Sequence, residues 1–122
     1  MKILVVDDSK DIASLLNQVL STVGHTVTTA HNGKDAVSLL SANSYDVVFL
    51  DIAMPDFSGL DVISKLAEIG RVKTSPIVLF TATPITDSEV QDLMERGIHS
   101  ILRKPVRLET LFAKIEEISK GS

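Results

Sequence analysis

Short apolar runs that alternate with stretches of helical spacing constrain the fold of this chain more than any other feature. The runs are rich in β-branched residues and lie at 3–6, 27–29, 47–50, 77–80 and 98–102. A strand followed by a helix, repeated five times, predicts parallel strands joined by helical crossovers. Three of these runs, 3–6, 47–50 and 77–80, are apolar throughout. This is typical of parallel strands that are covered by helices on both faces.

Right-handed crossovers and short connections leave few ways to wind five such units. The strand order 2-1-3-4-5 is the commonest for this size, so we predict a doubly wound five-stranded parallel sheet, the flavodoxin-like (βα)5 sandwich of the α/β class. The chain has 122 residues and contains no Pro-rich or Ser-rich linker and no internal repeat. We therefore expect residues 1–122 to form a single domain.

Two helical stretches carry clear apolar faces, and each face is expected to pack on the sheet. The first stretch ends before Gly24, and its apolar residues are Ile12, Leu15, Leu16, Val19, Leu20 and Val23. The second lies near the C-terminus and contains Leu108, Leu111, Phe112, Ile115 and Ile118. Capping-box spacing indicates two more helix starts, because Ser58 precedes Asp61 and Thr86 precedes Glu89 by three residues.

The composition excludes several classes of protein. The sequence has no cysteine, which rules out disulfide frameworks and cysteine metal sites and favours a cytoplasmic location. Sixteen acidic residues against twelve Lys and Arg give a net charge of −4, the wrong sign for a surface that grips nucleic acid. The apolar runs fall far short of the roughly 20 residues that span a bilayer. We therefore expect no membrane contact and no direct binding of nucleic acid.

Polar residues follow each strand that borders the predicted ligand crevice. In an open parallel sheet, ligands bind at the carboxyl ends of the strands where the strand order reverses, here between the first and third strands. This rim receives Asp7, Asp8, Asp51, Thr81 and Lys104. Each residue alone has a structural explanation, such as a helix cap, a turn or a solvated charge. Their convergence on one rim favours a functional site.

Three carboxylates on one rim repel one another by about 4 kcal/mol per pair, at a separation of about 4 Å and an effective dielectric constant of about 20. The repulsion is relieved if the pKa values of the carboxyl groups rise or if a cation binds among them. We favour the cation. The oxygen ligands that Asp7, Asp8 and Asp51 offer suit Mg²⁺, which we predict as the cofactor.

The acidity of the rim argues against a nucleotide or flavin site, and the sequence contains neither the dinucleotide-binding nor the P-loop glycine pattern. A phosphoryl group can enter where Mg²⁺ and Lys104 neutralise its charge. Asp51 is the best candidate nucleophile, because the third strand is central, and its attack on phosphorus would give an aspartyl phosphate. Thr81 and Lys104 would then donate hydrogen bonds to the phosphoryl oxygens.

The candidate residues lie in four sequence blocks, VVDDS at 5–9, FLDIAMPDFSGLD at 49–61, FTA at 80–82 and RKP at 103–105. In their order and near-usual spacing, these blocks resemble the receiver domain of two-component response regulators, over essentially the whole chain. The resemblance implies a phosphorylation-dependent signalling switch. It also implies self-catalysed phosphotransfer and dephosphorylation rather than the turnover of an enzyme.

The resemblance assigns roles to the acidic residues. Asp51 would accept a phosphoryl group from a histidine kinase, a phosphotransfer protein or a small donor such as acetyl phosphate. Asp8, Asp51 and the backbone carbonyl of Ala53 would ligate Mg²⁺, while Asp7 would act mostly through water.

The resemblance also assigns the partner surface and the basic end of the site. Thr81 and Lys104 would contact the phosphoryl oxygens, and the Lys104–Pro105 peptide bond is expected to be cis. The face made by the fourth helix, fifth strand and fifth helix would dock a downstream protein or a second copy of the domain. The basic residues of the last quarter of the chain are interleaved with acidic ones, so we interpret them as part of this face rather than as a DNA-binding surface.

Two features depart from the family pattern. Where the family carries an aromatic residue that swings inward with the threonine, this chain has Ile101, which is stiff and has no ring. We expect Ile101 to be a core residue of the fifth strand and Thr81 to act through loop movement. Ala53 and Thr83 occupy the positions that tune water access to the acyl phosphate. Ala53 cannot position a water through its side chain, whereas Thr83 can bond one weakly.

Two alternatives remain open. A phosphohydrolase of the haloacid-dehalogenase kind also forms an aspartyl phosphate, but it needs an acid two residues after the nucleophile, where Ala53 stands. A pseudo-receiver would bind partners without being phosphorylated, although all five site residues are present here.

Overall fold

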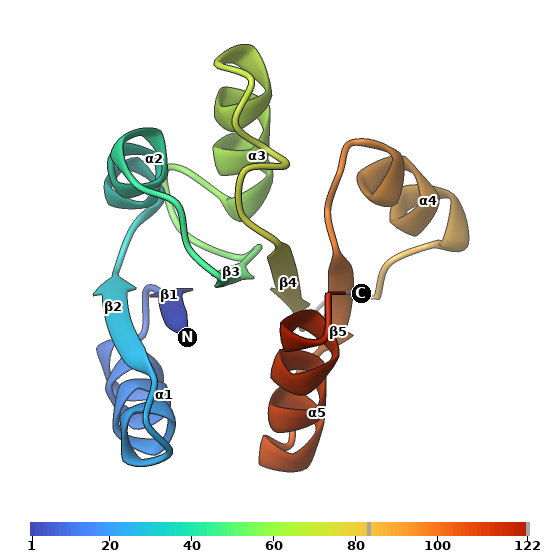
Figure 1. Cartoon of the computed structure of the whole chain (residues 1–122). Coiled ribbons are helices and arrows are strands. Elements are labelled where there is room, and N and C mark those ends of the chain that lie inside the picture. The colour runs from blue at the N-terminus through green and yellow to red at the C-terminus, as the bar shows by residue number, and fades with distance from the viewer. Residues whose placement is uncertain (83, 122) are drawn as a thin grey trace.

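The computed structural model describes residues 1–82 and 84–121, so Thr83 and its expected contact with water lie outside the described residues. Five strands and five helices alternate along the part that is described (Figure 1). In chain order they are β1 (Lys2–Val6), α1 (Lys10–Thr22), β2 (Thr26–Ala30), α2 (Gly33–Ala42), β3 (Val47–Asp51), α3 (Gly59–Glu68), β4 (Ile77–Thr81), α4 (Asp87–Glu95), β5 (Ser100–Arg103) and α5 (Leu108–Ser119).

All strand pairs are parallel, and the strand order is β2-β1-β3-β4-β5, which confirms the predicted topology. Strand β3 pairs with β1 on one side and with β4 on the other, so it lies at the centre of the sheet. Every residue of β3 and β4 is buried. The apolar runs in these strands are therefore explained by helices on both faces of the sheet.

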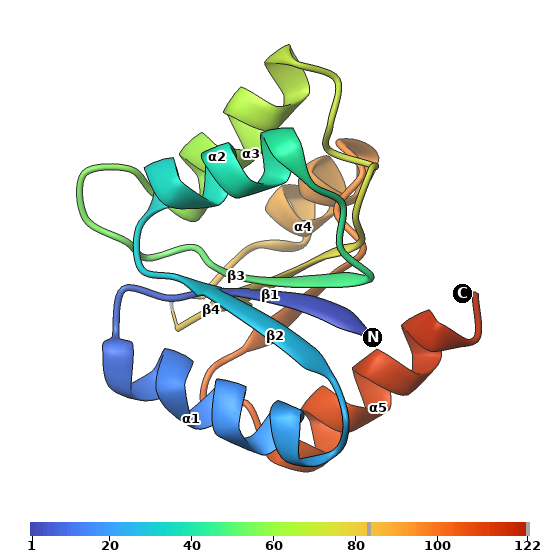
Figure 2. The same ribbon diagram turned by 60° about the vertical axis from the view of Figure 1, so that its left-hand side comes forward.

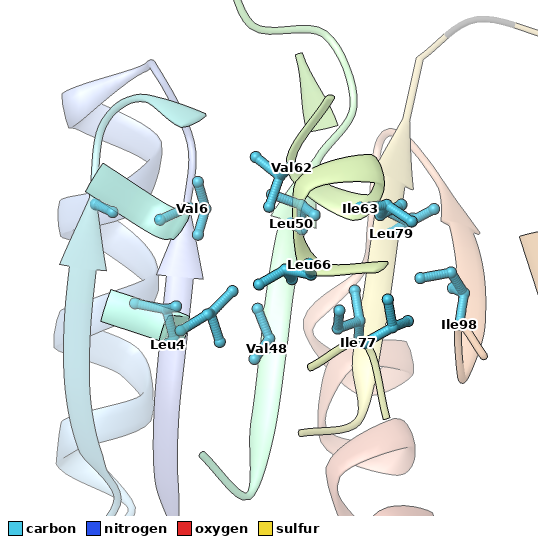
Figure 3. Close-up of a cluster of buried hydrophobic side chains, with 14 of the residues drawn as sticks. Leu4, Val6, Val48, Leu50, Val62, Ile63, Leu66, Ile77, Leu79 and Ile98 are labelled. Carbon is cyan, nitrogen blue, oxygen red and sulfur yellow. The ribbon is translucent and has the colours of Figure 1, made fainter. Parts of the chain in front are cut away.

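Helices form a layer on each side of the sheet. Figure 2 shows α1 and α5 on one face and α2, α3 and α4 on the other. Two buried clusters correspond to these layers. In the first, Leu50 and Leu79 of the sheet pack with Ile63 and Leu66 of α3 (Figure 3). In the second, the sheet residues pack against α1 and α5, and the ring of Phe49 stacks on that of Phe80.

The predicted helix starts at Ser58 and Thr86 are confirmed. Each side chain accepts from a backbone N–H in the first turn, and Asp61 or Glu89 reaches back to the N-cap backbone, which completes a capping box.

The C-terminus of α2 is held by a side chain from another segment. The guanidinium of Arg71, which lies between α3 and β4, donates to the carbonyl of Leu40 at 2.9 Å and to that of Asn43 at 3.0 Å.

The predicted fifth strand begins two residues too early. Gly97 has a φ of 106° and ends α4 in a Schellman motif, in which the N–H of Ile98 donates to the carbonyl of Leu93 and that of Gly97 to Met94. Ile98 and Leu93 are both buried in the same cluster. The apolar signal of Ile98 therefore belongs to the end of α4, and β5 starts at Ser100.

The apolar face predicted for the first helix packs only in part. Ala13, Leu16 and Leu20 are the buried residues of α1, whereas Ile12 is 41% and Leu15 56% exposed. The face is wider than the strip of sheet that α1 covers, so its outer edge stays in contact with solvent. Val23 at the C-terminal end of the helix and Leu108 at the start of α5 are exposed as well.

Among the described residues, no helix combines the length and the apolar character that a membrane crossing requires.

Candidate functional site

The carboxyl ends of the central strands place the predicted site residues on one rim. Asp7 follows β1, Asp51 ends β3, Thr81 ends β4, and Lys104 follows β5. Because β1, β3 and β4 are neighbours in the sheet, their carboxyl ends open at the same edge. Asp7, Asp51 and Thr81 are all buried, so this rim is polar and yet largely withdrawn from water.

The three carboxylates converge as predicted. Asp7, Asp8 and Asp51 each offer an oxygen, and these oxygens lie within 4.8 Å of one another. Asp8 is exposed, whereas Asp7 and Asp51 are buried. The site therefore has one side open to solvent and one side set into the end of the sheet.

Asp51 is held at both carboxylate oxygens. Its Oδ1 accepts a hydrogen bond from the backbone N–H of Ala53 at 3.1 Å, and its Oδ2 accepts one from the Lys104 ammonium at 3.1 Å. The backbone at Gly59, at the start of α3, also lies very close to the backbone of Asp51. A Cβ at Gly59 would lie 2.6 Å from the backbone oxygen of Asp51, so only glycine fits where the loop returns to this strand.

Asp7 is held at one oxygen and poorly satisfied at the other. Its Oδ1 accepts from the backbone N–H of Ser9 at 2.9 Å. Its Oδ2 is buried and accepts no hydrogen bond from any described group, although the Lys104 ammonium lies 3.6 Å away. Burial raises the pKa of Asp7 above its ordinary value, the Ser9 N–H and Lys104 oppose that rise, and the charges of Asp51 and Asp8 add to it.

This donor set fits Mg²⁺. All the convergent side-chain ligands are carboxylate oxygens, and one of them, Oδ2 of Asp7, is buried without a hydrogen bond. A buried polar atom of this kind is rare unless it has a partner such as an ion or a water. The N–H of Ala53 is occupied by Asp51, while the predicted role of the Ala53 carbonyl as a ligand stays a prediction.

Lys104 links the last strand to the acidic residues. Its backbone N–H donates to the carbonyl of Thr81 at 2.8 Å, which ties the start of the β5–α5 loop to the end of β4. The Lys104–Pro105 peptide bond is cis, as the family resemblance implies. With its ammonium between Asp51 and Asp7, Lys104 neutralises part of the negative charge at the rim.

Ile101 lies in β5 opposite Leu79 of β4. It is partly buried and packs against the cluster on the α2, α3 and α4 side of the sheet. The predicted core position is thus met only in part, because the Ile101 side chain also lines an open pocket between α4 and α5.

Sequence analysis missed two residues that support Asp7. Ser9 is the N-cap of α1, and its backbone N–H also fixes the Asp7 carboxylate. His31 follows β2, and its Nδ1 lies 3.4 Å from the backbone oxygen of Asp7. The predicted strand order could have identified His31. It makes β2 the neighbour of β1, so the residue that follows β2 lies near the residue that follows β1.

Comparison with known proteins agrees with this geometry. Residues 3–116 match the response regulator receiver domain. The chain is 34% identical over 120 residues to the transcriptional regulatory protein TcrA of Mycobacterium tuberculosis, which covers 98% of this chain and 46% of TcrA. It is 35% identical to the transcriptional regulatory protein DltR of Streptococcus agalactiae, over 94% of this chain and 50% of DltR. The chain thus spans about half the length of these relatives.

Solved structures show the same fold. The receiver domain of the Francisella response regulator 1452 superimposes with a TM-score of 0.86 at 28% identity and covers 98% of this chain and 97% of that one. The response regulator TrrA of Thermotoga maritima, in a complex with Mg²⁺ and BeF, gives a TM-score of 0.77 at 32% identity, over 96% of this chain and 97% of TrrA. With its sequence blocks, strand order and acidic rim, the chain belongs to the family of response regulator receiver domains.

Proposed function

We propose that the chain is a phosphorylation-dependent switch in which Asp51 accepts the phosphoryl group. The observation that carries this proposal is the double contact of Lys104, whose ammonium lies 3.1 Å from Asp51 and 3.6 Å from the buried oxygen of Asp7. A cation between two carboxylates prepares the rim for a group that is itself negatively charged. Residues 1–122 would form one receiver domain.

In the transfer step, a carboxylate oxygen of Asp51 forms a bond to phosphorus. The bond from phosphorus to a histidine nitrogen, or to the acyl oxygen of a small donor, breaks, and the leaving group keeps the electron pair. The Lys104 ammonium is within reach of the Asp51 carboxylate and would stabilise the charge on the transferred oxygens. The N–H of Ala53 holds the other Asp51 oxygen and orients the carboxylate.

Asp7, Asp8 and Asp51 would hold Mg²⁺ together with the carbonyl of Ala53. When bound, Mg²⁺ neutralises charge on the acceptor and on the phosphoryl oxygens. The buried Oδ2 of Asp7 and the convergence of the three carboxylates support this assignment. The Mg²⁺ and BeF in the TrrA complex agree with the same chemistry in a relative.

The response to phosphorylation would pass through Thr81 and the loop that follows it. Thr81 lines a cavity of about 610 Å³ between α3 and α4, together with Ile85 and Leu93. This space allows the β4–α4 loop to shift when the Thr81 hydroxyl turns to a phosphoryl oxygen. Because Ile101 is partly buried against the core cluster and has no ring, we propose loop movement rather than side-chain rotation as the switch.

The partners follow from the family. A histidine kinase or phosphotransfer protein would supply the phosphoryl group. The surface of α4, β5 and α5 would dock a downstream protein or a second copy, without direct contact to nucleic acid or membrane. We keep the cytoplasmic location and the absence of enzymatic turnover as predictions.

The two alternatives are not favoured. A haloacid-dehalogenase-like phosphohydrolase needs an acidic side chain where Ala53 stands, whereas Ala53 contacts the Asp51 carboxylate through its backbone N–H. A pseudo-receiver would gain nothing from the buried Oδ2 of Asp7, which accepts no hydrogen bond. Such a group lowers the stability of the fold, so its presence favours a site that binds an ion or a phosphoryl group.

Labelling by acetyl phosphate tests the proposal. The protein should gain one phosphoryl group in the presence of Mg²⁺, as measured by intact-protein mass spectrometry, and lose this reaction in Asp51→Asn and in EDTA. Asp56→Asn is the matched control, because Asp56 lies in the loop after Asp51 and is exposed. Labelling of Asp51→Asn to the wild-type level, or no labelling of the wild type, would overturn the proposal.

A further inference from the structure

His31 contacts the backbone of the acidic site from the neighbouring strand. It follows β2 and is half-buried, and its Nδ1 lies 3.4 Å from the backbone oxygen of Asp7. A carbonyl oxygen only accepts hydrogen bonds, so Nδ1 carries the proton and donates. The accepting oxygen belongs to the peptide group that joins Asp7 to Asp8. His31 therefore acts on the link between two of the three carboxylate residues of the site.

Asp8 is the least restrained of these three carboxylates. Asp7 accepts a hydrogen bond from the N–H of Ser9, and Asp51 accepts one from the Lys104 ammonium. Asp8 is exposed, and its carboxylate makes no hydrogen bond or ion pair within the part of the chain that the structure describes. Because the peptide group is planar, the backbone dihedral angles on its two sides set the direction of the Asp8 side chain. A hydrogen bond to the carbonyl of Asp7 restricts these angles.

The backbone on both sides of His31 is held in place, so its ring has a fixed base. On one side, the carbonyl of Ala30 accepts from the N–H of Asp7 at 3.1 Å. On the other side, a Cβ at Gly33 would lie 2.5 Å from the backbone oxygen of Phe57, so α2 begins in close contact with the loop that follows β3. The β2–α2 loop is thus held between the ends of β1 and β3, where the carboxylates lie.

We propose that His31 is a positioning residue for Mg²⁺ binding, which fixes the Asp7–Asp8 peptide group and so keeps the Asp8 carboxylate close to those of Asp7 and Asp51. This inference rests on the proposed function, in that it takes the three carboxylates as the Mg²⁺ ligands. Among the described residues, the convergent ligand atoms are carboxylate oxygens, so His31 acts through its hydrogen bond and not as a ligand. Loss of the imidazole should weaken Mg²⁺ binding while all three carboxylates remain.

Isothermal titration calorimetry with Mg²⁺ measures this role. His31→Ala should raise the dissociation constant for Mg²⁺ about tenfold. His31→Asn should bring it back to within about threefold of the wild type, because the amide nitrogen of asparagine and Nδ1 of histidine are bonded at the same position of the side chain. His25→Ala is the matched control and should leave the dissociation constant unchanged. His25 lies at the other end of β2, is also half-buried, and has its Nδ1 3.0 Å from the nitrogen of Met1.

Labelling by acetyl phosphate separates positioning from a general structural role. His31→Ala should need about tenfold more Mg²⁺ for the half-maximal rate, while its rate at saturating Mg²⁺ stays within about twofold of the wild type. Urea denaturation in EDTA measures the stability of each variant without metal. Equal dissociation constants for the wild type and His31→Ala, whatever the stability of the variant, contradict the inference and leave the proposed function standing. Binding as weak in His31→Asn as in His31→Ala contradicts it too. A wild type that binds Mg²⁺ but is not labelled contradicts the proposed function and not the role of His31.

Discussion

Leu50 and Asp51 are adjacent residues of the central strand and are buried to nearly the same degree, with 0% and 3% of their surface exposed. Burial acts on them in opposite ways. It stabilises the fold at Leu50, because apolar surface leaves water, whereas at Asp51 and at its neighbour Asp7 it withdraws charge from water. The interior of the sheet therefore carries the stability, and the carboxyl ends of the same strands carry the reactivity.

Phe49→Ala should have the largest effect and tests the first half of this comparison. Phe49 is fully buried, and its ring lies 5.4 Å from that of Phe80, centroid to centroid. Removal of the ring should lower the free energy of unfolding by about 3–5 kcal/mol. Urea denaturation monitored by circular dichroism measures the loss. A change below about 1 kcal/mol would show that the core collapses around the missing ring and that stability is not concentrated there.

Gly59→Ala tests how closely the site depends on the loop behind it. The added Cβ would lie 2.6 Å from the Asp51 carbonyl oxygen and 2.8 Å from Cα of Ile52, so the backbone must shift. We expect a loss of about 1–3 kcal/mol in the free energy of unfolding, together with slower labelling of Asp51 by acetyl phosphate.

Gly24→Ala is the control for this substitution. A Cβ at Gly24 meets no atom within 4 Å, but Gly24 has a φ of 97°. Its cost should be about 1 kcal/mol of backbone strain, with no change in labelling rate. Equal labelling rates in both glycine variants would show that the position of the Asp51 backbone is not limiting.

Asp7→Asn should change the free energy of unfolding least, and it should raise this free energy rather than lower it. The buried carboxylate has one oxygen without a hydrogen bond, so its removal in the absence of divalent cations should raise the free energy of unfolding at neutral pH by up to about 1 kcal/mol. Mg²⁺ should then stabilise the wild type more than the variant, because a ligand that binds only the folded state adds to its stability. Thermal denaturation with EDTA and with Mg²⁺ measures both differences.

The pH dependence of stability follows from the same residue. Because the folded pKa of Asp7 is raised above its ordinary value of 3.8, the folded state holds the proton more tightly than the unfolded state. The stabilisation that Asp7 gains from this tighter proton binding is fully present below pH 3.8. It is lost as the pH rises through the folded pKa of Asp7. In EDTA, Asp7→Asn should lack this decline relative to the wild type. Parallel curves for the two proteins would contradict the assignment.

The order of the strands and the residues at their ends were predictable from the sequence. β-branched runs identify the strands, chirality and short connections restrict their order, and parallel strands bring Asp7, Asp51 and Thr81 to one edge without any further information. The capping boxes at Ser58 and Thr86 were predictable because they depend only on local spacing.

Features set by packing between elements were not predictable. Periodicity identified the apolar residues of α1 but not the width of the sheet beneath them, so Ile12 and Leu15 were assigned to the core. The apolar character of Ile98 fits a strand as well as the end of a helix, and only the contact with Leu93 decides between them. The buried oxygen of Asp7 without a hydrogen bond depends on atomic positions that no pattern of residue types specifies.

The bracing of α2 by Arg71 has a consequence for local unfolding. One guanidinium, fixed in the loop after α3, binds the carbonyls of Leu40 and Asn43 at the end of α2, which has no basic residue of its own in its last turn. The last turn of α2 cannot open without releasing Arg71. We therefore expect hydrogen exchange in that turn to be coupled to opening of the α3–β4 loop, although the two segments are far apart along the chain.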